Sequence, residues 1–317
     1  MKARSLKAAV AFYLESRRRL GFALESEGAL LKNLVEHAQK QGHCGPLTTQ
    51  LALDWVQIPP NSCSRQRARR LVAARHFATF WAAFDPRTQV PPAGLFGSAY
   101  GPRGSVHIYT PEQITALLAA TEQLSAEGLY NSTCHTLLGL LACTGLRSSE
   151  ALELQLSDWE PGQAVLTIRQ TKFGQSRYVP VSKSAAKSLQ TYVQARAQAF
   201  ASANSQSLFL NPQGRSLHYP QVRTTFAALR RQLGWDSYQP RPRLHDLRHT
   251  FTVNCLLGWY RQGQQELNAK ILSLAVYLGH RNIRHTYWYL TAVPELLVLG
   301  SARWAQALSL QKGAAHG

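Results

Sequence analysis

Six residues in this sequence are of the types that could break and rejoin a phosphodiester without a metal ion. They comprise two arginines, a lysine, two histidines and a late tyrosine, namely Arg147, Arg248, Lys172, His245, His280 and Tyr289. During in-line attack, negative charge builds on the non-bridging oxygens, and a planar guanidinium group can bind two such oxygens at once. A tyrosine nucleophile needs nearby cations, because its ordinary pKa is about 10. We therefore expect phosphoryl transfer that uses no metal and no cofactor.

Predicted helix ends and a predicted hairpin position these residues. Arg147 follows Gly145, where an apolar helix at about residues 131–143 stops and another begins. Two β-rich segments, residues 164–170 and 176–182, are separated by a turn that carries Lys172. His245 and Arg248 are three residues apart, so they share one face of a helix.

The same histidine segment also permits a metal-binding interpretation. His245 and His249 stand four residues apart with Asp246 between them, which is similar to the H-E-x-x-H zinc site of metallopeptidases. Asp246 is too short to replace the glutamate base well. No convincing third ligand follows, although His280 and His285 are available in principle. We therefore interpret His249 as a buried helix histidine and expect no bound metal.

The charge balance indicates a polyanionic partner. The 317 residues include 35 Lys and Arg against 17 Asp and Glu, which gives a net charge of +18 and a sequence pI near 10.1. Such an excess causes self-repulsion unless a polyanion binds, and nucleic acid is the usual one. An anionic membrane surface is the alternative, but no apolar stretch approaches about 18 residues and the N-terminus lacks a signal-peptide core. We expect a soluble protein with no membrane partner.

The five cysteines are odd in number, scattered, and never spaced as C-x-x-C. This pattern argues against a disulfide framework and against a cysteine zinc site. A reduced intracellular compartment is therefore expected.

Residues 1 to about 90 are predicted to form helices. These helices are expected at about residues 6–19, 25–41, 48–56 and 64–84. The last one has an apolar stripe with a 3.6-residue period, and arginines crowd its first half. The arginines could form a solvated face, but the basic composition favours contact with DNA phosphates by Arg65, Arg67, Arg69, Arg70 and Arg75.

Proline and glycine interrupt the helical pattern between residues 85 and 104, which is typical of a linker. A new helix then begins, because Thr110 can cap it, Pro111 suits its first position and Gln113 completes a capping box. We therefore place a domain boundary near residue 105. Beyond it, helices are predicted at about residues 111–124, 131–143, from 148, at 183–202 and 218–233, and onward to about 308.

In kind, order and spacing, the six residues resemble those of the tyrosine recombinase family, which includes phage integrases and Xer-like enzymes. The family's T-G-x-R-x-x-E motif is matched by TGLRSSE, in which Glu150 can orient Arg147 from the same helix face. The H-x-x-R motif is matched by His245 and Arg248, and YLGH supplies His280.

The resemblance also covers the lysine and the tyrosine. Lys172 fits the lysine that the family carries on a β-hairpin before an R-x-V-P strand, although Phe173 separates it from Gly174. From this turn its ammonium group could protonate the departing 5′ oxygen. Tyr289 lies nine residues after the YLGH histidine, as the family's nucleophile does. Tyr287 is about 200° away around the helix and is expected to be a packing residue.

This resemblance implies a mainly α fold with a small β-sheet. A helical, SAM-like core-binding domain (residues 1–104) and a catalytic domain (residues 105–317) would form a C-shaped clamp around double-stranded DNA. Tyr289 would attack the scissile phosphate, while His245 accepts its proton or contacts the phosphate and His280 donates to a non-bridging oxygen. The 3′-phosphotyrosyl bond would keep the bond energy, so that four protomers on two core sites could exchange strands through a Holliday junction without ATP.

The expected assembly is a monomer off DNA and a homotetramer on DNA, with a C-terminal helix that docks on the neighbouring protomer. A sister recombinase could be a further partner. We expect the protein to act at the nucleoid in a bacterial cytoplasm. The TYWYLTAVPELL segment is similar to recombinases of transposons and integrated elements.

Two other functions fit parts of the pattern. A type IB topoisomerase-like enzyme would use comparable residues to relax DNA, but the H-x-x-R motif and the compact helical N-terminal domain favour a recombinase. An architectural DNA-binding protein that does not cut would also be basic, but all six candidate catalytic residues are present. The target sequence is not predicted, nor is the choice among integration, excision, resolution and transposition.

Overall fold

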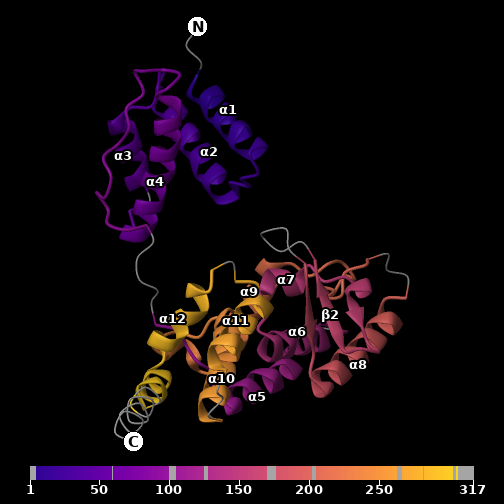
Figure 1. Cartoon of the computed structure of the whole chain (residues 1–317). Coiled ribbons are helices and arrows are strands. Elements are labelled where there is room, and N and C mark those ends of the chain that lie inside the picture. The colour runs from indigo at the N-terminus through magenta and orange to yellow at the C-terminus, as the bar shows by residue number, and fades with distance from the viewer. Residues whose placement is uncertain are drawn as a thin grey trace, which may run out of the picture. The chain divides into compact units, whose positions relative to one another are not determined.

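α-Helices form most of the described chain in a computed structural model of the protein, which confirms the predicted mainly α class (Figure 1). The structure describes residues 5–58, 60–99, 105–124, 128–169, 176–201, 205–262, 266–280, 282–302 and 305. The chain divides into two compact units, Met1–Gly104 and Ser105–Gly317. This division falls at the end of the segment that is rich in proline and glycine.

The described residues of the N-terminal unit form four helices around one hydrophobic core. They are α1 (Leu6–Arg19), α2 (Glu25–Lys40), α3 (Thr49–Gln57) and α4 (Ser64–Trp81). Thr48 caps α3 by accepting a hydrogen bond from a backbone N–H of its first turn. Leu34, Trp55 and Phe77 are buried together in the core. The last helix ends at Trp81, a few residues earlier than the sequence predicts.

The C-terminal unit carries the candidate site. Its helices are α5 (Pro111–Ala120), α6 (Tyr130–Thr144), α7 (Ser148–Leu152), α8 (Lys183–Ala199), α9 (Tyr219–Gln232), α10 (Asp246–Arg261), α11 (Leu267–Tyr277) and α12 (Arg284–Ala292). Short 3-10 turns occupy Thr121–Gln123, Leu156–Asp158 and Trp235–Ser237. The predicted capping box of α5 is present, because Thr110 and Gln113 exchange hydrogen bonds.

A three-stranded antiparallel sheet lies in the same unit, with the order β1 (Trp159–Glu160), β2 (Val165–Ile168) and β3 (Arg177–Pro180). The β2–β3 pair confirms the predicted hairpin strands, and Leu166 pairs with Val179. Both of these side chains are buried, so the sheet packs one face on the core. The sequence does not predict β1, because two residues are too few to show an alternating pattern.

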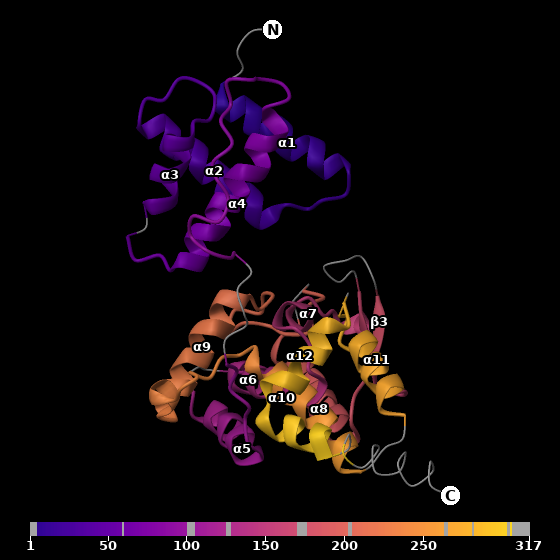
Figure 2. The same cartoon turned by 60° about the vertical axis from the view of Figure 1, so that its left-hand side comes forward.

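Helix α6 is the central element of the C-terminal unit. It contacts α8 on the side of the sheet and α10 on the other side, where α10, α11 and α12 pack together (Figures 1 and 2). Helix α11 also contacts β3. This arrangement brings the end of α6, the start of α10, the end of α11 and the start of β3 to one place.

The expectation that the chain after α9 is helical as far as about residue 308 is wrong for residues 238–245, which contain no helix. Pro240 and Pro242 explain the interruption, because proline disfavours the helical conformation of the residue before it and cannot donate a backbone hydrogen bond. The Gln239–Pro240 peptide bond is cis. The predicted helix end near residue 308 lies outside the described residues.

Candidate active site

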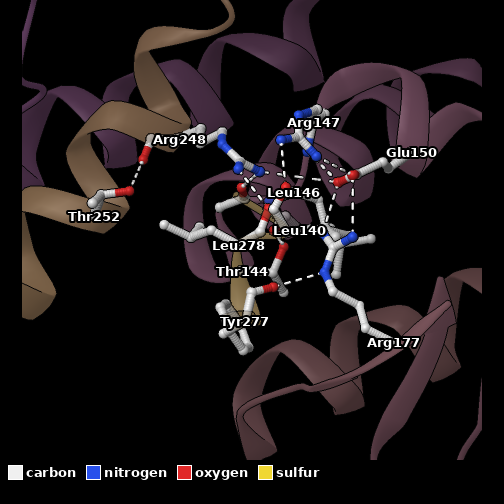
Figure 3. A network of polar contacts seen from close by, with 12 residues as sticks. Leu140, Thr144, Leu146, Arg147, Glu150, Arg177, Arg248, Thr252, Tyr277 and Leu278 are labelled. Carbon is white, nitrogen blue, oxygen red and sulfur yellow. Dashed lines mark hydrogen bonds and ion pairs between the residues drawn. The ribbon is translucent and has the colours of Figure 1, made fainter. Parts of the chain in front are cut away.

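A buried carboxylate, Glu150, gathers three arginines in the C-terminal unit (Figure 3). Its oxygens accept hydrogen bonds from Nη1 of Arg147 at 2.6 Å and from Nη2 of Arg177 at 2.8 Å. Nη1 of Arg248 lies 4.0 Å from Oε2 of the same carboxylate. The three guanidinium groups come from α10, from β3 and from the residue before α7, so the cluster exists only in the folded unit.

Backbone carbonyl groups fix the two arginines that the sequence analysis selected. Arg248 donates to the carbonyl oxygens of Gly145 at 2.8 Å and Leu278 at 2.7 Å. Arg147 donates to the carbonyl oxygen of Gly279 at 2.9 Å. These carbonyls belong to the ends of α6 and α11. Each guanidinium group is therefore held by chain segments far from it in sequence, which orients it before any ligand binds.

Arg177 is the third cation of the cluster, and its motif alone did not predict a role for it. Its Nε donates to the carbonyl oxygen of Tyr277 at 2.7 Å, while its two Nη atoms bond to Glu150. Its position in the R-x-V-P strand next to the predicted lysine turn is the signal that could have found it. Because Arg177 opens β3, it ties the sheet to the arginine cluster.

Two glycines with left-handed backbone conformations allow this close packing. Gly279 has φ +65°, and a Cβ atom there would lie 3.0 Å from Nη1 of Arg177 and 3.5 Å from Nη1 of Arg147. Gly145 has φ +63°, and a Cβ atom there would lie 2.5 Å from the ring of Phe251. Any other residue would be strained at both positions and would also displace these neighbours.

The charges of the cluster favour an additional anion. Burial alone would raise the pKa of Glu150, but hydrogen bonds from Arg177 and from the backbone N–H of Arg147 lower it to about 2. Burial lowers the pKa of Arg248 to about 10, and repulsion by Arg147 acts in the same direction. Three positive charges therefore face one negative charge, and the two remaining positive charges suit a phosphate group.

Tyr289 lies on α12 with its hydroxyl group directed to α10. Its oxygen is 2.6 Å from Nδ1 of His249, and the two ring centroids are 5.5 Å apart. Tyr289 is only 2% exposed and packs among core residues that include Val253 and Leu256. The hydroxyl group of Tyr289 therefore contacts His249, the residue directly after Arg248. From the sequence alone, His249 was interpreted only as a core histidine or a zinc ligand.

Of the two histidines that the sequence predicts at the site, His245 contacts this pair, and His280 lies on the turn that binds Arg147. His245 is the N-terminal cap residue of α10, and its ring packs edge-to-face on His249 with the centroids 4.7 Å apart. Partial desolvation lowers the pKa of His245 and the charge of Arg248 lowers it further, although the residue keeps a solvent-exposed surface. His280 follows Gly279, and its Nδ1 lies 2.8 Å from Oγ1 of Thr286 on α12.

The structure brings five of the predicted residues and Glu150 into neighbouring positions, whereas Lys172 lies outside the described residues. Tyr287 does not share the environment of Tyr289, because it is 37% exposed. The expectation that Tyr287 is a packing residue is therefore wrong. Its exposure agrees with the predicted angle of about 200° between the two tyrosines on one helix.

The arginines of α4 do not form one exposed face. Arg65 and Arg69 are exposed, while Arg67 donates to Ser62 and Arg75 to the carbonyl oxygen of Pro91. Arg67 and Arg75 would therefore have to share or give up these hydrogen bonds to bind a phosphate.

Arg70 is placed differently from the other α4 arginines. It is 7% exposed, its guanidinium carbon lies 4.3 Å from the ring centre of Trp55, and its Nη2 donates to Asn33 at 3.0 Å. Arg70 points inward because its position falls on the apolar stripe of α4. Its packing role was missed because a periodic pattern gives little weight to one arginine among apolar residues.

The contacts of the HDLRH segment also bear on the metallopeptidase interpretation. Asp246, which would have to act as the base, is buried and accepts hydrogen bonds from the backbone and the guanidinium group of Arg243. Within the described residues, no group of three His, Cys, Asp or Glu side chains could hold a metal ion. None of the described helices is long and apolar enough to cross a membrane.

Comparison with known proteins identifies relatives over nearly the whole chain. The sequence profile of the phage integrase family matches residues 108–295. A Sinorhizobium fredii protein named as an integrase/recombinase, y4rB, is 40% identical over 306 residues, which cover 92% of this chain and 95% of that protein. The tyrosine recombinase XerD of Rhizobium meliloti is 30% identical over 241 residues, which cover 73% of this chain and 71% of its own.

Solved structures share the fold at low sequence identity. The integrase of transposon Tn1549, in complex with a circular intermediate DNA, matches with a TM-score of 0.65 and 15% identity, covering 95% of this chain and 99% of that one. A lambda integrase dimer bound to a core site matches with a TM-score of 0.62 and 14% identity, covering 90% and 77%. At these identities the likeness concerns the fold.

Proposed function

This chain belongs to the phage integrase family, and we propose that it cuts and rejoins specific DNA sites through a 3′-phosphotyrosyl intermediate on Tyr289. The activity is site-specific DNA recombination, as its relatives named integrase, recombinase, XerC and XerD indicate. The assignment of individual residues to steps of the reaction rests on the site geometry and on the sequence motifs.

The observation that carries the proposal is the arginine cluster around Glu150. Its guanidinium groups are fixed by carbonyl oxygens and carry more positive charge than the single carboxylate offsets. Fixed cations of this kind stabilise the charge that develops on a pentacoordinate phosphorus, and they need no reorganisation during the reaction. Arg147 and Arg248 would bind the non-bridging oxygens, and Arg177 would hold Glu150 in place.

The remaining residues supply the nucleophile and the proton transfers. Tyr289 attacks the scissile phosphate and releases the 5′ oxygen, which takes a proton from Lys172. His280 donates to a non-bridging oxygen, and His245 assists beside Arg248. The freed 5′ hydroxyl of a partner strand then attacks the phosphotyrosine, so the bond energy passes from one DNA strand to another without ATP.

Double-stranded DNA with specific core sites is the proposed substrate. The solved relatives in complex with DNA support this proposal. The N-terminal unit would act as a core-binding domain that closes with the catalytic unit around the duplex, and four protomers would pair two sites. A mobile genetic element in a bacterial cytoplasm is the setting that we propose.

The test uses a pool of nicked duplexes with randomised arms, incubated with the full chain in EDTA. Complexes that survive denaturation are isolated, their DNA is sequenced, and the modified residue is mapped by peptide mass. We expect adducts that share one sequence and carry the nucleotide on Tyr289. Tight binding of the pool without any adduct would contradict the proposal.

A further inference from the structure

We propose that His249 accepts the proton of the Tyr289 hydroxyl group during DNA cleavage. This inference rests on the proposed function, because it concerns the activation of the same nucleophile. It differs from the role expected from the family resemblance, in which His245 receives that proton. The structure places the His249 ring, one helical turn further along α10, at the hydroxyl oxygen.

The geometry of the pair meets the requirement for a general base. A base must lie about 2.6–3.2 Å from the atom whose proton it takes, and the distance from Nδ1 of His249 to Oη of Tyr289 is 2.6 Å. Both side chains are buried. Bulk water therefore does not compete for this hydrogen bond. The imidazole ring belongs to a buried residue within α10.

The neighbours of the pair suggest why proton transfer would wait for DNA. Arg248 would attract a phenolate on Tyr289. Burial lowers the pKa of Arg248, and the negative charge of a Tyr289 phenolate acts in the opposite direction. Besides desolvation, Arg248 and Arg147 disfavour positive charge on His245, whose ring packs on that of His249, so these arginines also oppose a cation formed at this pair of rings. A bound phosphate diester would offset these positive charges. Proton transfer to His249 then becomes more favourable when the substrate occupies the arginine cluster.

The proposed step balances in atoms and charge. The proton of Oη moves to Nδ1 of His249, and the freed electron pair of the phenolate forms the O–P bond. The P–O5′ bond breaks, and the 5′ oxygen takes a proton from Lys172. In the rejoining step the imidazolium ion returns its proton to Oη as the tyrosine leaves. Because Tyr289 is only 2% exposed in the DNA-free chain, DNA docking has to open a path to its oxygen.

The substitution His249→Asn separates holding the hydroxyl from accepting its proton. The Oδ1 atom of asparagine can stand near the place of Nδ1 and accept the hydrogen bond, but an amide cannot take the proton. Single-turnover adduct formation on the selected nicked duplex should be about 100-fold slower than in the wild type, which is the usual effect of losing a general base. Unfolding by urea checks that the variant is folded, and His249→Gln replaces it if it is not.

The matched control is His135→Asn. His135 is a half-buried histidine of α6 in the same unit, with Nδ1 against the carbonyl oxygen of Leu118. We expect its adduct formation to stay within about threefold of the wild type. A rate within this range for a folded His249→Asn protein would overturn the proposal, because the amide would then suffice.

A second substrate locates the defect at the nucleophile. A nicked duplex with a 5′-bridging sulfur in place of the scissile 5′ oxygen has a leaving group that needs no acid. We expect this substrate to restore adduct formation in Lys172→Ala but not in His249→Asn. Equal restoration in both variants would place His249 on the leaving-group side and overturn the proposal. Failure of the proposed function would look different, since the wild type itself would form no adduct.

Discussion

Arg147 donates a hydrogen bond to the carbonyl oxygen of Gly279, 132 residues later in the chain, at 2.9 Å. This bond joins the turn after α6 to the turn after α11. The first turn carries one candidate phosphate ligand, and the second is followed directly by His280. The chain can bring these groups together only because Gly279 leaves room for the guanidinium groups of Arg147 and Arg177.

The substitution Gly279→Ala should damage the site more than the fold. At a φ of +65°, alanine costs about 1 kcal/mol or slightly more. The added Cβ atom, 3.0 Å from Nη1 of Arg177, would displace the guanidinium groups from their positions in the cluster. Adduct formation should fall by about 10- to 100-fold. Gly234→Ala is the control, because Gly234 has φ +71° with nothing within 4 Å of the added atom. A similar rate in both variants would refute the role of this close packing.

The substitution Arg177→Lys should slow cleavage although it keeps the positive charge. A lysine has a single nitrogen in place of the three that Arg177 uses for Glu150 and the carbonyl oxygen of Tyr277, so Glu150 would lose its orientation. We expect adduct formation to be about 10-fold slower, measured under single-turnover conditions. Arg230→Lys is the control, since the Arg230 side chain is 13% exposed against 11% for Arg177 and pairs with Asp236. Equal activity of the two variants would show that Arg177 has no special part.

The pH dependence of stability should report the charge of Glu150. Its pKa in the folded chain is about 2, below its ordinary value of 4.5, so the unfolded chain binds more protons between these values. The ionised Glu150 therefore stabilises the fold above about pH 4.5, and this contribution is lost as the pH falls towards 2. Glu150→Gln should lower the free energy of unfolding by about 3 kcal/mol at pH 7. Urea unfolding should show that this difference shrinks in acid, and a constant difference would refute the prediction.

Substitution by alanine should affect protein stability at Arg70 and DNA binding at Arg69. Arg70→Ala removes the contacts with Trp55 and Asn33, so the free energy of unfolding should fall by about 1–2 kcal/mol. Arg69→Ala should leave stability within about 0.5 kcal/mol. If Arg69 contacts a phosphate, its loss should also reduce the slope of log affinity against log salt by about one. DNA binding at several salt concentrations distinguishes the two arginines, and an unchanged slope would remove Arg69 from the DNA interface.

Much of the fold could be predicted from local patterns. The capping residues around Thr110 and the 3.6-residue periods located the helices, and alternation located β2 and β3. The two-residue strand β1 gave no such pattern. The interruption at residues 238–245 could have been read from Pro240 and Pro242, since proline restricts the residue before it.

The candidate site could be predicted only in part, because spacing along the chain does not show contacts between distant segments. Arg147 and Arg248 stood in recognisable motifs, whereas Arg177 looked like an ordinary strand residue. The contact between His249 and Tyr289 joins two helices, so no periodic pattern reveals it. Arg70 shows the reverse error, since an arginine in a basic run was assigned to DNA while its helix position faces the core.

The most direct test of the account is adduct formation by Tyr289→Phe and Tyr287→Phe on a nicked duplex in EDTA, read on a denaturing gel. We predict that Tyr289→Phe binds the duplex with unchanged affinity and forms no adduct. Tyr287→Phe should form the adduct as the wild type does, since Tyr287 is exposed on another side of α12. An adduct that persists in Tyr289→Phe, or one that is lost only in Tyr287→Phe, would contradict the assignment of the nucleophile.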